Sequence, residues 1–244
     1  MEVKTETLKA LEQIEMKAGV GHIEPRCEIV QEGNQDVLYL SGAVYPDSWA
    51  FEDEPHISAK AVRTALDGKK DVTIHINSPG GSVFEGLDIY NVLKDHKGYV
   101  TVQIDGIAAS IASVICMGAD KVTARKPSVF MIHRAWAGAV GNPTELRKFA
   151  DQLEEIDLAS NMSYIDRFNG QEYELNQLLD AETYLSAEKA QKLGFIDEII
   201  VDEKEEDPVQ EPEEEPTEEP KKTLFDNFKA SVEGVNFYSK FRRN

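Results

Sequence analysis

The sequence predicts an α/β fold, in which successive β-α-β units build a mostly parallel sheet and one long helix projects from it. Segments with the alternating or wholly apolar pattern of strands are separated repeatedly by segments whose apolar residues follow helical spacing. Crossovers of this kind join strands that run in the same direction, so the repeats imply a parallel sheet with helices on both faces. The stretch 142–170 keeps helical spacing over a length that a domain of this size does not require.

Strands and helices are expected to alternate along residues 36–124, and a further strand, three helices and a last strand are expected to follow up to residue 201. Residues 72–76 illustrate the strand pattern, because apolar and polar side chains alternate there. The other expected strands span 36–44, 99–106, 121–124, 128–133 and 195–201. The expected helices span 58–68, 81–98, 107–119, 142–170, 171–181 and 186–194. Thr144 is expected to cap the long helix, and Gly170 is expected to end it.

Composition predicts one domain with a large core. At 244 residues, of which 41% are apolar, the chain can bury a core sufficient for one domain of ordinary to large size plus an appendage. No segment approaches about 18 consecutive apolar residues, and the N-terminus lacks a signal-peptide run, so we expect a cytoplasmic protein with no membrane partner. Cys27 and Cys116 are too few for a disulfide framework, and the apolar surroundings of Cys116 predict a place in the core. No histidine has metal-type spacing, so neither a metal nor a cofactor is expected; the histidines are His22, His56, His75, His96 and His133.

The charge is concentrated near the C-terminus. The net charge is −19, and residues 202–220 hold 11 of the 45 acidic residues against the single Lys204. Their prolines and mutual repulsion predict a disordered linker. Residues 221–244 are basic and aromatic, which indicates a tail that docks on a partner or folds back on its own assembly. The predicted organisation is an N-terminal extension (1–35), a globular domain (36–201), an acidic linker (202–220) and a basic tail (221–244).

Two adjacent glycines at a strand end mark a candidate site. Residues 75–86 read HINSPGGSVFEG, so a turn over 77–81 separates a strand from the helix that follows. Glycine tolerates backbone angles that other residues avoid, and its missing Cβ lets a ligand or another chain approach closely. Such a turn can cradle an anion.

Ser110 and His133 are the candidate reactive side chains. Ser110 ends the small-residue run GIAAS (106–110) directly after a strand, where a helix N-terminus favours developing negative charge. His133 ends the strand 128–133, and open parallel sheets carry their sites at the C-terminal ends of strands. The alternative interpretations are a helix-capping serine and a structural histidine.

Four ordered motifs make the chain resemble the Clp-type serine peptidases over roughly residues 36–200. The motifs are INSPGG (76–81), GIAAS (106–110), FMIH (130–133) and YLSAEKAQKLGFID (184–197). The resemblance implies serine endopeptidase activity in a Clp-like domain over 36–201. It also implies the spiral of β-α-β units that Clp-type and crotonase-type enzymes share.

The resemblance further implies which residues act. In the family, the serine of the small-residue run is the nucleophile and the histidine that closes the strand is the general base. An aspartate before the Leu-Ser-Ala block orients the histidine. These roles fall on Ser110, His133 and Asp180. The chain is slightly shorter than the family before that block, so Glu182 rivals Asp180, and Glu174 is a more distant candidate.

By the same resemblance, the backbone N–H groups of Gly81 and Ile111 form an oxyanion hole, which gives the two glycines their purpose. Losing one such donor typically costs about 3 kcal/mol of transition-state stabilisation. Gly80 and Ser82 are expected to contact the substrate, because the open turn leaves a strand edge on which an extended peptide can pair.

The family resemblance also implies a ring-shaped homo-oligomer that acts on protein or peptide substrates, with the helix 142–170 at the contact between rings. Housekeeping members receive substrate from a separate ATPase. The N-terminal segment, acidic linker and basic tail depart from that pattern and resemble the Clp-like proteases of phage head-assembly modules. We therefore expect a capsid maturation protease, in the host cytoplasm or the virion precursor, whose tail binds capsid or scaffold protein.

Several alternatives stay open at this point. One is a housekeeping Clp subunit, and another is a crotonase-type acyl-CoA enzyme in which Ser110 and His133 are incidental. A third is a non-catalytic assembly protein that keeps the fold. A Ser-Lys peptidase is disfavoured because GIAASIAS lacks that group's Ser-Gly-Gly-Tyr, and an ordinary α/β-hydrolase because G-x-S-x-G is absent. No nucleic-acid partner is expected.

Overall fold

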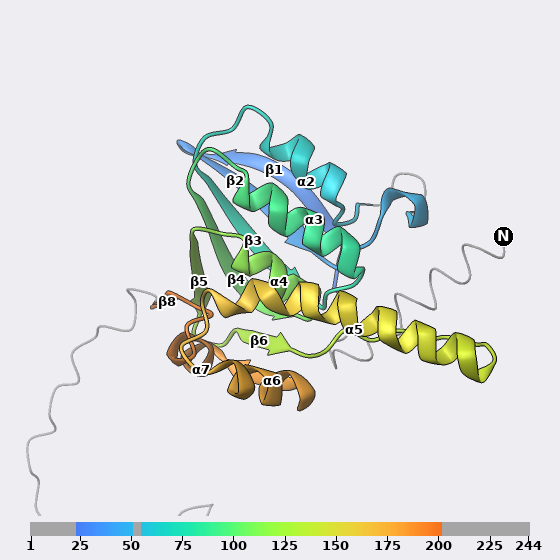
Figure 1. The fold of residues 1–244 in the computed structure, drawn as a ribbon. Coiled ribbons are helices and arrows are strands. Elements are labelled where there is room, and N and C mark those ends of the chain that lie inside the picture. The colour runs from blue at the N-terminus through green and yellow to red at the C-terminus, as the bar shows by residue number, and fades with distance from the viewer. Residues whose placement is uncertain (1–22, 51–54, 202–244) are drawn as a thin grey trace, which may run out of the picture. The chain divides into compact units, whose positions relative to one another are not determined.

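The computed structural model describes residues 23–50 and 55–201, which form one eight-stranded sheet with helices packed against it (Figure 1). The strands are β1 (Arg26–Glu32), β2 (Gln35–Ser41), β3 (Val72–Ser78), β4 (Val100–Ala109), β5 (Lys121–Arg125), β6 (Val129–Ile132), β7 (Thr183–Ser186) and β8 (Glu198–Ile200). The helices are α2 (Ala59–Leu66), α3 (Val83–Lys94), α4 (Ile111–Met117), α5 (Pro143–Ile165), α6 (Glu172–Asp180) and α7 (Ala187–Lys192), with a short 3-10 helix η1 (Asp47–Trp49). The predicted acidic linker (202–220) and basic tail (221–244) lie outside the described residues.

The sheet is mostly parallel, as the sequence predicts. Its strands follow the order β1-β2-β3-β4-β5-β8, while β6 pairs with β4 and β7 pairs with β6. All pairings are parallel except those of β1 with β2 and of β6 with β7. The predicted α/β class is therefore confirmed.

β4 is longer than the sequence pattern predicts, and its extension positions the site. Residues 107–109 were expected to begin a helix, but Ile107–Ala109 pair in parallel with Val129–Met131 of β6. The earlier part of β4 pairs with β5 instead. This run of small apolar residues satisfies its backbone groups through the added strand, so α4 begins only at Ile111. Ser110 is thereby placed at the junction of a strand and a helix.

Two strands lie where no strand was expected. β1 (26–32) pairs antiparallel with the whole of β2, so the sheet begins inside the range assigned to an N-terminal extension. β7 (183–186) pairs antiparallel with β6. Both strands are short or only partly buried, and their residues lack a clear alternation of apolar and polar side chains.

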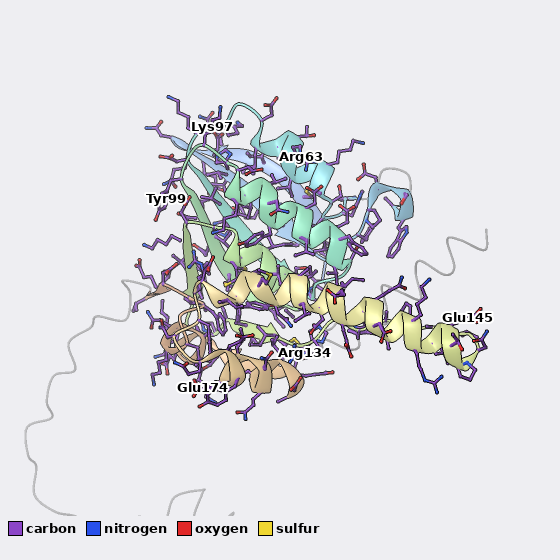
Figure 2. All side chains as sticks on the ribbon, in the orientation of Figure 1. Arg63, Lys97, Tyr99, Arg134, Glu145 and Glu174 are labelled. Carbon is purple, nitrogen blue, oxygen red and sulfur yellow. The ribbon has the colours of Figure 1, made fainter. Side chains whose placement is uncertain are left out.

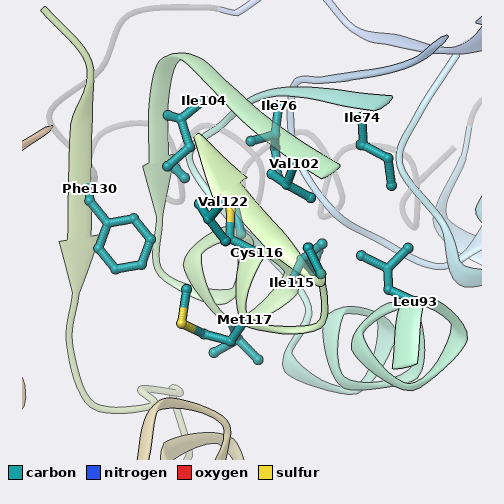
Figure 3. Close-up of a cluster of buried hydrophobic side chains, with 14 of the residues drawn as sticks. Ile74, Ile76, Leu93, Val102, Ile104, Ile115, Cys116, Met117, Val122 and Phe130 are labelled. Carbon is teal, nitrogen blue, oxygen red and sulfur yellow. The ribbon is translucent and has the colours of Figure 1, made fainter. Parts of the chain in front are cut away.

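The core lies between the sheet and the helices α2, α3 and α4 (Figure 3). Ile74 of β3, Val102 of β4 and Ile115 of α4 meet there and are fully buried. Cys116 lies in the same cluster, which confirms its predicted place in the core. On the other face of β3, residues such as His75 are polar and only partly buried, so in the described chain helices cover one face of these strands rather than both.

The long predicted helix is confirmed as α5, whose N-terminal half extends past the rest of the described domain (Figure 1). Its cap is Asn142 rather than Thr144, because Asn142 Oδ1 accepts from the N–H groups of Thr144 and Glu145 at 3.0 and 3.1 Å. Glu145 accepts from the Asn142 N–H at 2.8 Å and completes a capping box. The helix ends at Ile165, before the expected stop. Among residues 23–50 and 55–201, no helix combines the length and apolarity needed to cross a membrane.

Candidate active site

Ser110 and His133 lie at the same edge of the sheet, where β3, β4 and β6 end. β4 pairs in parallel with β3 on one side and, through Ala109 and Met131, with β6 on the other. The glycine turn after β3, Ser110 after β4 and His133 after β6 therefore meet in one place. This is the edge at which open parallel sheets carry their sites.

Ser110 occupies a sharp corner between β4 and α4. Its backbone has φ 56° and ψ −130°, a conformation rare for residues other than glycine, and its N–H donates to Met131 O at 3.0 Å. Ser110 is the N-cap residue of α4, yet within the described chain its side chain makes no capping hydrogen bond. Instead, Ser110 Oγ lies 2.7 Å from Nε2 of His133. The interpretation of Ser110 as a helix-capping side chain is therefore wrong.

His133 is the histidine that reaches the serine. When Nε2 is unprotonated, it accepts a hydrogen bond from the Ser110 hydroxyl and is placed to remove that proton. The other described histidines bond to different groups: His75 to Asp105 at 2.9 Å, His56 to Asp47 at 3.1 Å, and His96 to Lys70 O at 2.5 Å. His22 lies outside the described residues.

The glycine turn lies directly against Ser110. A Cβ on Gly80 would lie 2.7 Å from Ser110 Cβ, so only glycine allows this approach. The Gly80 C=O accepts from the Val44 N–H at 2.8 Å, and the Ser82 N–H donates to Val44 O at 2.7 Å. A parallel bridge of this kind uses the groups on either side of Gly81, so the N–H of Gly81 itself points away from Val44.

A second backbone donor comes from Ile111. It is the first residue of α4, and the first N–H groups of a helix have no acceptor within the helix. A Cβ on Gly80 would lie 3.1 Å from the Ile111 nitrogen, so the glycine turn and this amide are close neighbours. Gly81 and Ile111, whose N–H groups the family resemblance assigns to an oxyanion hole, both line the cavity beside Ser110, and the role of these N–H groups stays a prediction.

A cavity of about 560 Å³ opens beside Ser110 and His133. Much of its lining is apolar and comes from α3, α4, α5 and the segment after β6, including Val83, Phe84, Val114, Trp136, Leu153 and Ile156. Ser82, one of the two expected substrate contacts, also lines it, whereas the other, Gly80, lies against Ala109 and Ser110. A cavity of this size and character can hold a large apolar side chain.

Asp180, the expected orienting carboxylate, bonds to Arg134. It is the last residue of α6, and its Oδ1 accepts from Arg134 Nε at 2.8 Å. Arg134 is the residue that follows His133, so Asp180 is tied to the segment that carries the imidazole. The structure thus brings Ser110 and His133 into contact and places Asp180 against their neighbour, and the orienting role of Asp180 stays a prediction.

The rival carboxylates differ in their surroundings. Glu174 accepts from the Gln171 N–H at 2.7 Å and completes the capping box of α6, which is a structural role. Glu182 has φ 47° and directly precedes Thr183, the residue that pairs with Ile132 at the end of β6. Glu182 therefore lies at the end of the β6–β7 pair from which His133 follows.

Arg134 and Asp157 belong to none of the motifs found in the sequence. The guanidinium of Arg134 also bonds to Asp157 on α5 and to Asn176 on α6, each at 2.9 Å (Figure 2). The one signal in the sequence is the position of Arg134 next to His133. Its partners are 23 to 46 residues away, so nothing local in the sequence identifies them.

Comparison with known proteins identifies the family. The family model for Clp protease matches residues 55–203. The chain is 33% identical to ATP-dependent Clp protease proteolytic subunit 2 of Synechococcus sp. over 166 residues, 67% of this chain and 82% of the relative. It is 34% identical to the ATP-dependent Clp protease proteolytic subunit of Ligilactobacillus salivarius over 143 residues, 57% of this chain and 72% of the relative.

These matches confirm the predicted resemblance at the level of the family and set aside the crotonase-type alternative. They do not separate the phage-type branch from the housekeeping one. Together with the fold and the contact between Ser110 and His133, they show that the chain belongs to the Clp protease family.

Proposed function

We propose that the chain is a serine endopeptidase that hydrolyses peptide bonds in protein or peptide substrates, with Ser110 as nucleophile and His133 as general base. The observation that carries this proposal is the 2.7 Å contact between Ser110 Oγ and His133 Nε2 beside an apolar cavity. A serine hydroxyl is a poor nucleophile at neutral pH unless an adjacent base takes its proton. Family membership supports the proposal, because the relatives are named proteolytic subunits.

The proposed mechanism proceeds in two stages. Ser110 Oγ attacks the carbonyl carbon of the scissile bond while its proton moves to His133 Nε2. The N–H groups of Gly81 and Ile111 stabilise the resulting oxyanion. His133 then gives the proton to the leaving amine, and an acyl-enzyme remains on Ser110. Water, deprotonated by His133, hydrolyses this ester and restores the serine.

The cavity beside Ser110 supports a preference for substrates with a large apolar side chain next to the scissile bond. Its walls combine aliphatic side chains with Phe84 and Trp136, which are 68% and 42% exposed and so leave apolar surface for a substrate to cover. Covering that surface stabilises the complex by roughly 25 cal/mol per Å² of apolar area removed from water.

Hydrolysis of fluorogenic peptide amides tests this function. We expect turnover of a peptide with leucine or phenylalanine before the cleaved bond, and slower turnover of the matching peptide with aspartate there. Ser110→Ala and His133→Ala should each lower kcat by about 10⁶-fold. His96→Ala is the matched control, because His96 lies between α3 and β4, at the opposite edge of the sheet. Equal rates for wild type and Ser110→Ala would reject the proposal.

The apolar surface of α5 supports a homo-oligomer. Leu158, Met162 and Ile165 are spaced three and four residues apart, so they lie on one side of α5, and they are 56%, 68% and 47% exposed. A second copy of this chain is the occupant we propose for this surface. A ring built from such contacts would agree with the expectation from the family.

For its biological setting we infer a phage-type capsid maturation protease, with a housekeeping Clp subunit as the second candidate. The family match ends at residue 203, so nearly all of the acidic linker and the whole basic tail lie beyond it, which supports the first. The names of the relatives, ATP-dependent proteolytic subunits, support the second.

Two measurements separate these settings. Deleting residues 203–244 should abolish incorporation into capsid assemblies formed with scaffold protein, while peptide hydrolysis stays unchanged. Unchanged incorporation would reject the role of the tail. Degradation of a folded protein that begins only when a Clp ATPase and ATP are added would favour the housekeeping candidate.

A further inference from the structure

We propose that Ser113 is a positioning residue: its hydroxyl holds the peptide unit between Ser110 and Ile111 in the orientation that presents the Ile111 N–H to the oxyanion. This inference rests on the proposed function, in which that N–H stabilises the oxyanion formed at Ser110. Ser113 is the second serine of GIAASIAS, and it is fully buried on α4. It would act on the reaction only through the backbone of Ser110.

The carbonyl oxygen of Ser110 accepts two hydrogen bonds from Ser113. The Ser113 hydroxyl donates to it at 2.6 Å, and the Ser113 N–H donates to it at 3.0 Å. A peptide unit is planar and trans, so its C=O and its N–H point in opposite directions. The C=O of Ser110 and the N–H of Ile111 belong to one such unit. The bonds that fix the carbonyl therefore also fix the direction of the Ile111 N–H.

This peptide unit has to be held, because its orientation strains Ser110. The backbone of Ser110 has φ 56° and ψ −130°. Turning the unit by about 180° would bring Ser110 to φ and ψ of about +57° and +47°, the left-handed region that residues other than glycine adopt at lower cost. That turn would reverse the direction of the Ile111 N–H and carry Ser110 O away from Ser113. The two bonds from Ser113 therefore oppose it.

Tyr164 of α5 holds the Ser113 hydroxyl in place. The Tyr164 OH lies 2.8 Å from Ser113 Oγ, and both side chains are buried. Because Ser113 gives its own proton to Ser110 O, Tyr164 is the donor of this second bond. Hydrogen bonds in such a chain polarise one another, and they are stronger in a buried site than in water. The chain from Tyr164 to Ser110 O therefore makes the Ile111 N–H a better donor to a developing negative charge.

Ser113→Ala in the full chain tests the proposal. It should lower kcat for a peptide amide by about 10-fold, less than the outright loss of an oxyanion donor, with KM within about two-fold. A peptidyl trifluoromethyl ketone forms a tetrahedral adduct that carries the oxyanion, so its inhibition constant should rise by about the same factor. Tyr164→Phe keeps the bond from Ser113 and removes the donor behind it, so it should lower kcat by about three-fold.

Ser128→Ala is the matched control. Ser128 is also a buried serine whose hydroxyl donates to a backbone carbonyl, that of Ile104, at 2.8 Å. It precedes β6, whereas His133 follows that strand, so the deleted bond lies away from the site. This variant should keep the wild-type kcat and the wild-type inhibition constant.

Other outcomes would overturn the proposal. Wild-type kcat in a folded Ser113→Ala protein would show that the hydroxyl does not hold the peptide unit. A fall in kcat with an unchanged inhibition constant, or a change in KM alone, would place the effect outside the oxyanion hole. Equal losses in Ser113→Ala and Ser128→Ala would indicate a general loss of packing.

A second variant covers the case in which Ser113→Ala does not fold. Ser113→Cys keeps a weaker donor in nearly the same volume, and it should lower kcat by about three-fold, with the inhibition constant raised in parallel. Wild-type values for both quantities in this variant would then overturn the proposal. Failure of the proposed function would look different, because the wild type itself would not hydrolyse the peptide.

Discussion

Backbone strain is found next to the candidate site. Among residues 23–50 and 55–201, two residues other than glycine have a positive φ, namely Ser110 at 56° and Glu182 at 47°. Such conformations cost on the order of 1–3 kcal/mol each and persist only where the surroundings hold them. At Ser110 the surroundings are the bond from its N–H to Met131 O and the bond that its C=O accepts from Ser113 Oγ at 2.6 Å. The strained corner presents Oγ to His133, which supports a nucleophilic role.

A first prediction at the level of single residues concerns the close approach of Gly80 to Ser110. Gly80→Ala should lower kcat for peptide hydrolysis by about 100-fold, because its new Cβ would lie 2.7 Å from Ser110 Cβ and displace the nucleophile or the glycine turn. Gly68→Ala is the matched control. Gly68 also has a positive φ, +70°, but no atom lies within 4 Å of its would-be Cβ, so the variant should keep its kcat. Equal losses in the two variants would contradict this reasoning.

The two thiols give a prediction that depends on pH. Burial raises the pKa of Cys27 to about 11, and burial likewise raises the pKa of Cys116 to about 12. The thiolate is the reactive form, so raised pKa values keep its fraction small at pH 8 and let it grow only as the pH approaches 11. A thiol reagent at pH 8 should therefore modify the native protein far more slowly than the urea-unfolded protein, with peptidase activity retained. Loss of activity in step with modification of one cysteine would speak against a serine nucleophile.

At the level of secondary-structure elements, the buried hydroxyl of Tyr164 connects α5 to the turn between β4 and α4 that carries Ser110. Tyr164 of α5 is 2% exposed, and its OH lies 2.8 Å from Ser113 Oγ on α4. Ser113 Oγ donates to Ser110 O, so it accepts from Tyr164. Burial raises the pKa of Tyr164, which keeps the donating proton in place. Movement of α5 would therefore reach the backbone of Ser110 through two side chains, those of Tyr164 and Ser113.

Removing the Tyr164 hydroxyl should lower the free energy of unfolding by a measurable amount. Tyr164→Phe deletes one buried hydrogen bond, and we expect the free energy of unfolding to fall by about 1 kcal/mol in urea titrations. Tyr173→Phe makes the same chemical change on α6 at a side chain that is 62% exposed, and it should leave the midpoint unchanged. A Tyr164→Phe protein as stable as wild type would show that the bond contributes nothing.

Periodicity predicted most of the elements, and it failed where pairing between distant segments decided the structure. The helix α2 and the strand β3 follow their apolar spacing closely. Residues 107–109 share the same small apolar character as α4, and only their pairing with β6 makes them a strand. Likewise, Ser110 and His133 could be identified as site residues because each follows a predicted strand. The hydrogen bonds of Arg134 could not be predicted, because its partners come from two helices that lie later in the chain.

At the scale of the whole molecule, the described chain leaves apolar surface uncovered on α5. The projecting N-terminal half of α5 (Figure 1) and the exposed side chains of Leu158, Met162 and Ile165 suit contacts between copies of the chain. Tyr164 of the same helix is hydrogen-bonded to Ser113. Assembly through α5 would therefore also restrain the backbone at Ser110.

Charged side chains introduced on this surface of α5 should dissociate the proposed homo-oligomer. The double variant Leu158→Glu with Met162→Glu should have a lower native mass than wild type, because assembly would bury like charges in the contact between copies. Its melting temperature should stay near that of wild-type protein diluted until it dissociates. Asn91→Glu, an exposed neutral-to-acidic change on α3, is the control and should keep the wild-type mass. Sedimentation that gives the same mass for all three proteins would contradict the proposed role of α5.

The decisive experiment for Ser110 as a nucleophile activated by His133 is covalent labelling by a fluorophosphonate, followed by peptide mapping. We expect a single adduct on Ser110 in the wild type, none in Ser110→Ala, and a greatly slowed adduct in His133→Ala. An active wild-type enzyme whose adduct maps to another residue, or whose Ser110 is labelled at the same rate without the imidazole, would contradict it.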